Sequence, residues 1–228
     1  MNTIDGGPVR RVFHGELALA LGITLLGMSL AFYAKGDMGM STLSLMAFVM
    51  SRVVPAASFG TWNYIIQCTM MLVLVLLLKK IKPGYFISFG LAIVYGLLVD
   101  FFSFFVAMLP DGLLPRGMYY LAGFCGMAAG TALLLKSGMP ILPFDTFMRD
   151  ITLNFDIPYR KIRTGFDISS FAFSALLGMT CLGSFQGIGP GTLVNVALMG
   201  LAVSKVSEFL DRRFVFRVLS RRLGSLSS

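Results

Sequence analysis

The chain has 228 residues, of which 56% are hydrophobic and only 13% are charged, and its mean hydropathy is +0.81. An average soluble protein carries about 25% charged residues, so this composition excludes an ordinary soluble domain and predicts a polytopic membrane protein. The formal net charge of +8 needs no nucleic-acid partner, because basic residues collect on the cytoplasmic side of membrane proteins.

Six apolar runs are long enough to cross a bilayer as helices, which takes about 20 residues each. We expect these spans at 16–34, 61–78, 84–109, 117–135, 164–183 and 190–210. The first run follows two arginines, as in a signal peptide, but it ends in "AFYA", which is a poor cleavage site. We therefore expect it to stay in the protein.

Two further segments, 40–54 and 144–155, look helical but are too short or too polar to span. The first would rise about 21 Å from Ser41 to Val54, which is less than the ~30 Å of hydrocarbon. Both segments offer residues that commonly cap a helix start, namely Ser41 or Thr42 in the first and Asp145 or Thr146 in the second.

The two halves of the chain resemble each other at a shift of 104 residues, with "GMSTLSLM" (39–46) over "PFDTFMRD" (143–150). The shift pairs Ser41 with Asp145, Thr42 with Thr146, and Asn63 with Asp167. Each half holds three spans and one short helix, and since three is odd the halves enter the membrane from opposite sides. The predicted fold is therefore all-α, with six transmembrane helices in two inverted three-helix repeats, each with a re-entrant or half helix, as in many secondary transporters.

This organisation divides the chain into a cytoplasmic N-terminus (1–15), a first repeat (16–109), a second repeat (117–210) and a basic cytoplasmic tail (211–228). With both termini inside, 16 of the 19 basic residues face the cytoplasm, and only Lys35, Arg52 and Arg116 lie outside. The positive-inside rule then predicts a multi-pass membrane protein with both termini in the cytoplasm.

The starts of the two short helices predict a binding site, because the free N–H groups of a helix start suit a polar or anionic ligand. The residues assigned to a solute site are Ser41, Thr42, Asn63, Asp145, Thr146 and Asp167. Two alternatives remain: these side chains join helices by hydrogen bonds, or they lie at helix ends in the interface. In particular, Asp167 can pair with Arg163 one turn earlier, and 144–155 can be a cytoplasmic surface helix with Arg149 and Asp150 in water.

Other polar residues lie within the apolar runs, where ionisable groups are costly. Asn63 and Gln67 are four apart and share a helix face, and Asn195 lies in the last run. Asp100, in "YGLLVDFFSFF", has no basic neighbour in the sequence. If it lies deep in the membrane it would ionise reluctantly, so a role in proton coupling is a hypothesis for this residue.

The sequence offers no sign of an enzyme, a metal site or a cofactor. It contains no HExxH, GxSxG or Walker loop. Cys68, Cys125 and Cys181 are far apart and are read as small buried hydrophobes, and His14 stands alone beside the N-terminus. We therefore expect a non-enzymatic protein without metal or cofactor.

Two features concern partners. In the tail, apolar residues alternate with arginines; the apolar residues are Phe209, Phe214, Phe216 and Leu219. The tail can lie on the anionic inner leaflet, it can simply be the end of the last helix, and the two interpretations are compatible. Gly126 and Gly130 have a GxxxG spacing that allows close helix packing. That packing is expected within one bundle, and a homodimer is the alternative.

The last run opens with "GIGPGTLVNVALMG", Gly187 to Gly200. With the six-span layout, its Gly189, Gly191, Thr192 and Gly200 resemble the turn that opens the final helix of YczE/YitT-type bacterial membrane proteins, over about residues 14–210. Pro190 and the charged 144–155 segment depart from that pattern. The resemblance implies a bacterial inner-membrane protein with a transporter-like role, and it implies no substrate.

These patterns favour a small secondary transporter or exporter of an unidentified small solute, working by alternating access between the two repeats. The alternative is a membrane-embedded regulatory or partner-binding protein that carries no flux.

Overall fold

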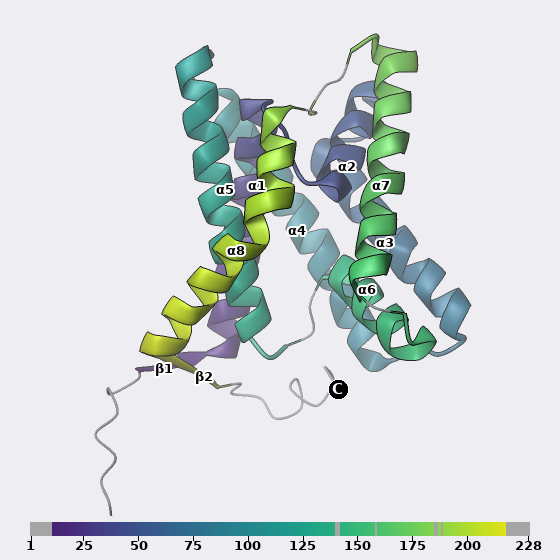
Figure 1. Cartoon of the computed structure of the whole chain (residues 1–228), viewed down its shortest axis with the longest axis vertical. Helices are drawn as coiled ribbons and strands as arrows, with labels where there is room; N and C mark the ends of the chain where they lie inside the picture. Colours follow the sequence, from purple (N-terminus) through teal and green to yellow (C-terminus); the bar gives the residue numbers. More distant parts are fainter. Residues whose placement is uncertain (1–10, 140–141, 158, 185–186, 188, 218–228) are drawn as a thin grey trace, which may run out of the picture.

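The computed structural model describes residues 11–139, 142–157, 159–184, 187 and 189–217 (Figure 1). Nearly all of this part of the chain is helical. In chain order the elements are β1 (Arg11–His14), α1 (Gly15–Gly36), α2 (Thr42–Val53), α3 (Phe59–Leu78), α4 (Pro83–Ala107), α5 (Leu113–Lys136), α6 (Pro143–Phe155), α7 (Tyr159–Leu177), the π-helical turn η1 (Gly178–Leu182), α8 (Pro190–Arg213) and β2 (Phe214–Arg217).

Five helices of the described chain are long and apolar enough to cross a membrane: α1, α3, α4, α5 and the stretch Thr164–Leu182 formed by α7 and η1. Their outward surfaces carry exposed large apolar side chains such as Phe86, Leu97 and Phe104, which suits contact with lipid tails. The structure therefore indicates an integral, multi-pass membrane protein. The segment predicted as the sixth span forms the helix α8, which is not among these five and carries most of its charged residues in its second half.

Proline and turn residues set the helix ends. Prolines occupy the first helical position of α4, α6 and α8, where a missing N–H costs nothing. Ser41 occupies the N-cap position of α2, as predicted, but its hydroxyl bonds to that of Ser44 and not to a backbone N–H. The prediction is wrong for α6, whose N-cap is Leu142. Because Pro143 already starts α6, Asp145 lies within its first turn instead of capping it.

The helices form two groups that meet at α4. The first, the scaffold group, consists of α1, α4, α5 and α8, in which α1 packs on α5 and α4, and α5 packs on α8. The second, the half-helix group, consists of α2, α3, α6 and α7, in which α2 packs on α7 and α3, and α6 packs on α3 and α7. Helix α4 also contacts α3 and α6, and so joins the two groups (Figure 1).

Small residues allow α1 and α5 to approach closely. A Cβ atom added to Gly22 would lie 3.1 Å from the carbonyl oxygen of Gly130, and one added to Gly123 would lie 3.0 Å from that of Ser29. Gly126 also faces Ser29. The GxxxG spacing thus packs helices within the chain, as expected, while the homodimer stays a prediction.

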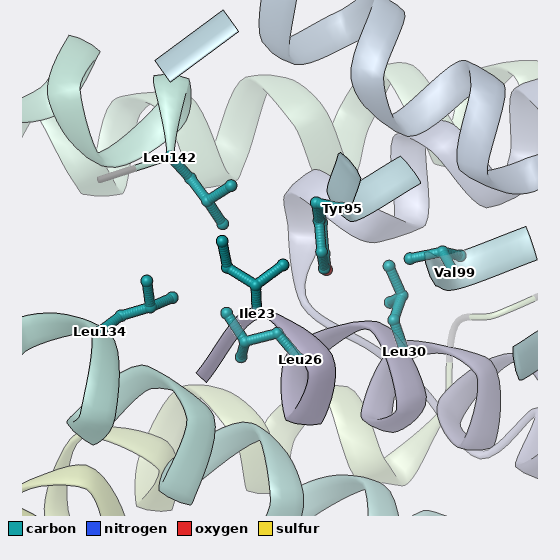
Figure 2. Close-up of a cluster of buried hydrophobic side chains, with 7 residues drawn as sticks. All are labelled: Ile23, Leu26, Leu30, Tyr95, Val99, Leu134 and Leu142. Atoms are coloured by element: carbon teal, nitrogen blue, oxygen red, sulfur yellow. The ribbon is translucent and has the colours of Figure 1, made fainter. Parts of the chain in front are cut away.

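The core of the scaffold group continues to the start of α6. Figure 2 shows Ile23 of α1 between Leu142, which precedes α6, and Leu26, with Tyr95 of α4 beside Ile23 and Val99 of α4 facing Leu30. Leu30 and Leu134 complete this cluster. Its buried apolar side chains connect the first turn of α6 to the middle of α4.

The two short helices both begin at mid-height in the bundle. Met70, near the middle of α3, shares one buried cluster with Leu43 at the start of α2 and Phe144 at the start of α6. From there α2 leads toward the start of α3, and α6 leads toward the start of α7 (Figure 1).

Two expectations need correction. The fold is not purely helical, because β1 and β2 form a parallel two-stranded sheet in which Val12 pairs with Val215. The apolar, partly β-branched sequence Phe-Val-Phe favours a strand there, and Phe13 packs edge-on against Phe214 and Phe216 at 5.4 and 5.5 Å. The predicted tail is therefore α8 up to Arg213 followed by β2, and Leu219 lies outside the described residues.

The second correction concerns the cysteines. Cys125 and Cys181 are exposed on the helix surface, and Cys68 is only partly buried. A position that faces lipid tails suits a small apolar residue such as cysteine as well as a position in the protein core does.

Candidate functional site

A cavity of about 410 Å³ lies where the two groups of helices meet, and all eight α-helices contribute to its wall. Of the six predicted site residues, five line it: Ser41, Thr42, Asn63, Asp145 and Asp167. The sixth, Thr146, is buried beside the cavity, with its hydroxyl 3.5 Å from that of Ser88. The structure thus brings together residues that lie more than a hundred positions apart in the sequence.

The start of α2 is joined to α7 across the cavity wall. The hydroxyl of Thr42 donates to Oδ1 of Asp167 at 2.5 Å. The carboxylate therefore lies at the N-terminus of α2, where free N–H groups and the helix dipole favour negative charge. The predicted alternative partner of Asp167, the side chain of Arg163, lies outside what the structure describes.

Asn63 and Gln67 of α3 form a buried amide pair. Their exposed fractions are 2% and 1%, and Nε2 of Gln67 donates to Oδ1 of Asn63 at 2.7 Å. Two polar atoms of the pair, Nδ2 of Asn63 and Oε1 of Gln67, have no hydrogen-bond partner among the described residues. Both residues line the cavity.

A third amide reaches the cavity from α8. The hydroxyl of Tyr33 donates to Oδ1 of Asn195 at 2.7 Å, while Nδ2 of Asn195 is buried and has no partner in the described part of the chain. Gln67 and Asn195 were recognised in the sequence as polar residues within spans but were not assigned to the site. Gln67 lies one helical turn from Asn63, and this spacing is the pattern in the sequence that indicates that Gln67 belongs to the same site. No pattern in the sequence pointed to Tyr33.

Asp100 does not line the cavity. Its Oδ1 accepts the backbone N–H of Gly60 at 2.7 Å, and its Oδ2 accepts the hydroxyl of Ser58, so the carboxylate caps the start of α3. These contacts give the charge a structural role at the helix end, and the role in proton coupling stays a prediction.

The Gly-rich turn before α8 holds the connector that leads into α2. The N–H of Gly191 donates to the carbonyl of Met38 at 2.8 Å, and the N–H of Gly187 donates to Asp37 at 3.0 Å. Gly39, with a φ of 125°, lies against the backbone of Thr192. A side chain on Gly39 or Gly191 would separate the two connectors, so this turn positions the start of α2 at the cavity.

The far end of α6 is anchored by a buried carboxylate. Asp150 is fully buried; it accepts from the hydroxyl of Tyr85 at 2.5 Å, and it lies 3.1 Å from Nε of Arg149 and 3.3 Å from Nζ of Lys82. The alternative in which 144–155 is a surface helix with Asp150 in water is therefore wrong for this residue.

A second pocket, of about 580 Å³, contains all three basic residues that the topology placed outside: Lys35, Arg52 and Arg116. Nζ of Lys35 lies 2.8 Å from Oδ1 of Asp111, which is itself largely exposed. The hydrogen bond and the positive charge of Lys35 lower the pKa of Asp111 below its ordinary value of 3.8. This pocket lies at the opposite end of α1 from β1.

A family model matches residues 13–208, and it describes DUF6198, a family of unknown function. The chain belongs to DUF6198. No curated protein and no solved structure matches it. The comparisons give no support to the YczE/YitT name, so the turn formed by Gly189, Gly191 and Thr192 is interpreted in this DUF6198 protein from its contacts alone.

Proposed function

We propose that this DUF6198 protein is a small secondary transporter with six transmembrane helices in two inverted repeats, α1–α4 and α5–α8. A solute binds in the central cavity, and the two groups of helices expose it to one side of the membrane and then to the other. Each step of this proposal has its own support.

The sixth crossing is supported by the positions of the chain ends. β1 leads directly into α1, β2 follows directly from α8, and the two strands pair. An odd number of crossings would put these strands on opposite sides of the membrane, whereas six crossings put them together. α8 has 24 residues and a length of about 36 Å, enough to cross ~30 Å of hydrocarbon. The excess of basic residues near both ends favours the cytoplasmic side.

The inverted repeat is supported by equivalent packing. α1 packs on its own equivalent, α5; α4 packs on α1 as α8 packs on α5; and α2 packs on α7 as α6 packs on α3. Two ion pairs follow the same relation. Lys35 at the end of α1 lies 2.8 Å from Asp111, just after α4, and Lys136 at the end of α5 lies 2.6 Å from Asp211, near the end of α8.

One pair of contacts breaks this equivalence. α3 packs extensively on α4, while their equivalents α7 and α8 make no comparable contact in the described part of the chain. An inverted repeat whose halves adopt different arrangements opens a central site to one side only, and an exchange of the two arrangements would open it to the other. This asymmetry supports alternating access.

The observation that carries the proposal is the cavity itself. It lies at the starts of two half helices, is built by all eight helices, and contains buried polar atoms that lack partners. Irregular backbone at membrane depth is tolerated where it lines such a cavity. The proposal assigns no catalytic chemistry to these residues.

The test begins with binding. The melting temperature of the purified protein is measured against a broad panel of ions and metabolites, since a ligand at 100 times its dissociation constant stabilises by about 2.7 kcal/mol. A stabilising solute is then tested on Asp145→Asn and Ser41→Ala variants and in flux assays with liposomes. Loss of stabilisation in both variants together with flux supports the carrier. Specific binding without flux contradicts it and favours the regulatory alternative.

A further inference from the structure

The polar atoms that the chain leaves without partners indicate what the cavity binds. A buried polar group without a hydrogen bond costs about 1–3 kcal/mol, and such groups are rare in native proteins. The described chain contains four such side-chain atoms, and three of them belong to residues that line the central cavity: Nδ2 of Asn63, Oε1 of Gln67 and Nδ2 of Asn195. Their concentration in one cavity points to a ligand that completes their bonds.

All three atoms belong to neutral amides. The two carboxylates in the wall already interact with other groups of the chain: Asp167 accepts from Thr42, and Asp145 also has a partner. A hydrogen bond leaves the negative charge of a carboxylate in place, and no lysine or arginine of the described chain lines the cavity, so an anion would meet like charges there. The atoms without a partner are all neutral, so the hydrogen bonds that a solute would complete are those of uncharged groups.

The pair on α3 presents a specific pattern. Because the amides of Asn63 and Gln67 are already bonded to each other at 2.7 Å, Nδ2 of Asn63 remains as a donor and Oε1 of Gln67 as an acceptor, and the two residues share one helix face. An amide edge recognises a partner that offers an acceptor next to a donor, as Asn and Gln do when they bind adenine. Asn195 supplies a further donor from α8.

The rest of the wall suits a small solute with an apolar body. Apolar and aromatic side chains, including Tyr95, Phe144 and Met127, complete the lining. A volume of about 410 Å³ falls within the ~300–1,000 Å³ range of small-molecule pockets, which combine apolar walls with a few fixed polar groups.

We propose that the cavity binds an uncharged small molecule with an amide-like edge, that is, a carboxamide, a lactam or a nucleobase, held by Asn63, Gln67 and Asn195. This inference rests on the function proposed above, of which it names the substrate class.

The first experiment needs no knowledge of the natural solute. Replacing both members of the pair, Asn63→Leu with Gln67→Leu, removes the two partnerless atoms together with the bond between the amides, so the empty protein should melt at the same or a higher temperature. Tyr85→Phe is the matched control, because its hydroxyl is buried and bonded to Asp150, and it should lower the melting temperature. A double variant that is destabilised as Tyr85→Phe is would show that the amides are structural, and would overturn the inference.

The second experiment uses named probes: uracil as a lactam in a ring, acetamide as a simple carboxamide, and tetramethylammonium and acetate as charged controls. We expect uracil or acetamide to raise the melting temperature of the wild-type protein, and the double variant to bind that probe at least about tenfold more weakly. Stabilisation by uracil alone would indicate a nucleobase site, and stabilisation by both probes would indicate a site for amides in general. No stabilisation by either uncharged probe, or amide-dependent binding of a charged probe, would overturn the substrate class.

These outcomes are separable from failure of the carrier proposal. If uracil or acetamide binds through Asn63 and Gln67 but is not carried across the membrane of proteoliposomes, the proposed binding site is correct and the proposed transport is wrong. If a charged solute is carried across the membrane of proteoliposomes and competes with the uncharged probes for the cavity, the proposed transport is correct and the proposed substrate class is wrong.

Discussion

The buried carboxylate of Asp150 gives the sharpest prediction about the fold. The change is Asp150→Asn, which keeps the shape of the side chain and removes its charge. In the structure this carboxylate is fully buried and accepts a hydrogen bond from Tyr85, while Arg149 and Lys82 keep 38% and 42% of their side chains exposed. Because the two cations are partly exposed, most of the lost stability should come from the buried hydrogen bond between Tyr85 and Asp150.

The magnitude follows from these contacts. A hydrogen bond to a charged group contributes about 1.5–3 kcal/mol, and each ion pair with a partly exposed cation adds about 0–1 kcal/mol. We expect a loss of about 3 kcal/mol in all, which at roughly 2–4 °C per kcal/mol for a chain of this size lowers the melting temperature by about 6–12 °C. Thermal unfolding in detergent measures it.

Asp211→Asn is the matched control. Asp211 also pairs with a lysine, Lys136 at 2.6 Å, but its side chain is 51% exposed. An exposed pair contributes below about 1 kcal/mol, so this variant should melt close to the wild type. Equal melting temperatures for the two variants would mean that Asp150 lies in water, and would refute the placement of α6 within the bundle.

Three further predictions test other parts of the structure. Gly191→Ala should destabilise the protein by about 1–3 kcal/mol in thermal unfolding, because the new Cβ atom would lie 2.7 Å from the carbonyl oxygen of Met38. The control is Gly200→Ala on the same helix, which should be neutral or slightly stabilising because a Cβ atom there meets open space. Val12→Cys with Val215→Cys, in a background without native cysteines, should form a disulfide under mild oxidant that gel electrophoresis detects, whereas Val12→Cys with Leu113→Cys should not; the reverse would contradict the paired strands. Lys35 lowers the pKa of Asp111, so the stabilisation by this pair is present above pH 3.8 and disappears as the pH falls through the lowered pKa. The difference in melting temperature between the wild type and Asp111→Asn should therefore shrink as the pH falls over that range. A difference that grows would contradict the pairing.

Much of the fold could be predicted because the relevant signals are local. Runs of about 20 apolar residues identify spans, and prolines at 83, 143 and 190 mark helix starts. The shift of 104 residues also aligned Ser41 with Asp145 and Asn63 with Asp167, and all four line one cavity. Polar residues that recur at equivalent positions of two apolar halves are therefore informative about the site.

The rest depends on contacts between distant residues, which single-sequence patterns do not encode. The pairing of β1 with β2 joins segments about 200 positions apart, and four residues of alternating pattern are too few to predict a strand. The sequence around Asp100 is apolar and leaves its depth open, and the contacts of its carboxylate with Gly60 and Ser58 at a helix start appear only in the fold. Likewise Tyr33 of α1 bonds to Asn195, which lies 162 positions later in α8.

The central claim is that water and a solute reach the cavity between the starts of α2 and α6. Its most direct test is the reaction of a single cysteine, Ser41→Cys, in a background without native cysteines, with a membrane-impermeant thiol reagent applied to either side of reconstituted vesicles. The account predicts labelling from at least one side, reduced by a solute that binds in the cavity, with Leu30→Cys in the packed core as the unreactive control. Absence of labelling from both sides, in a variant that melts like the wild type, would contradict the account.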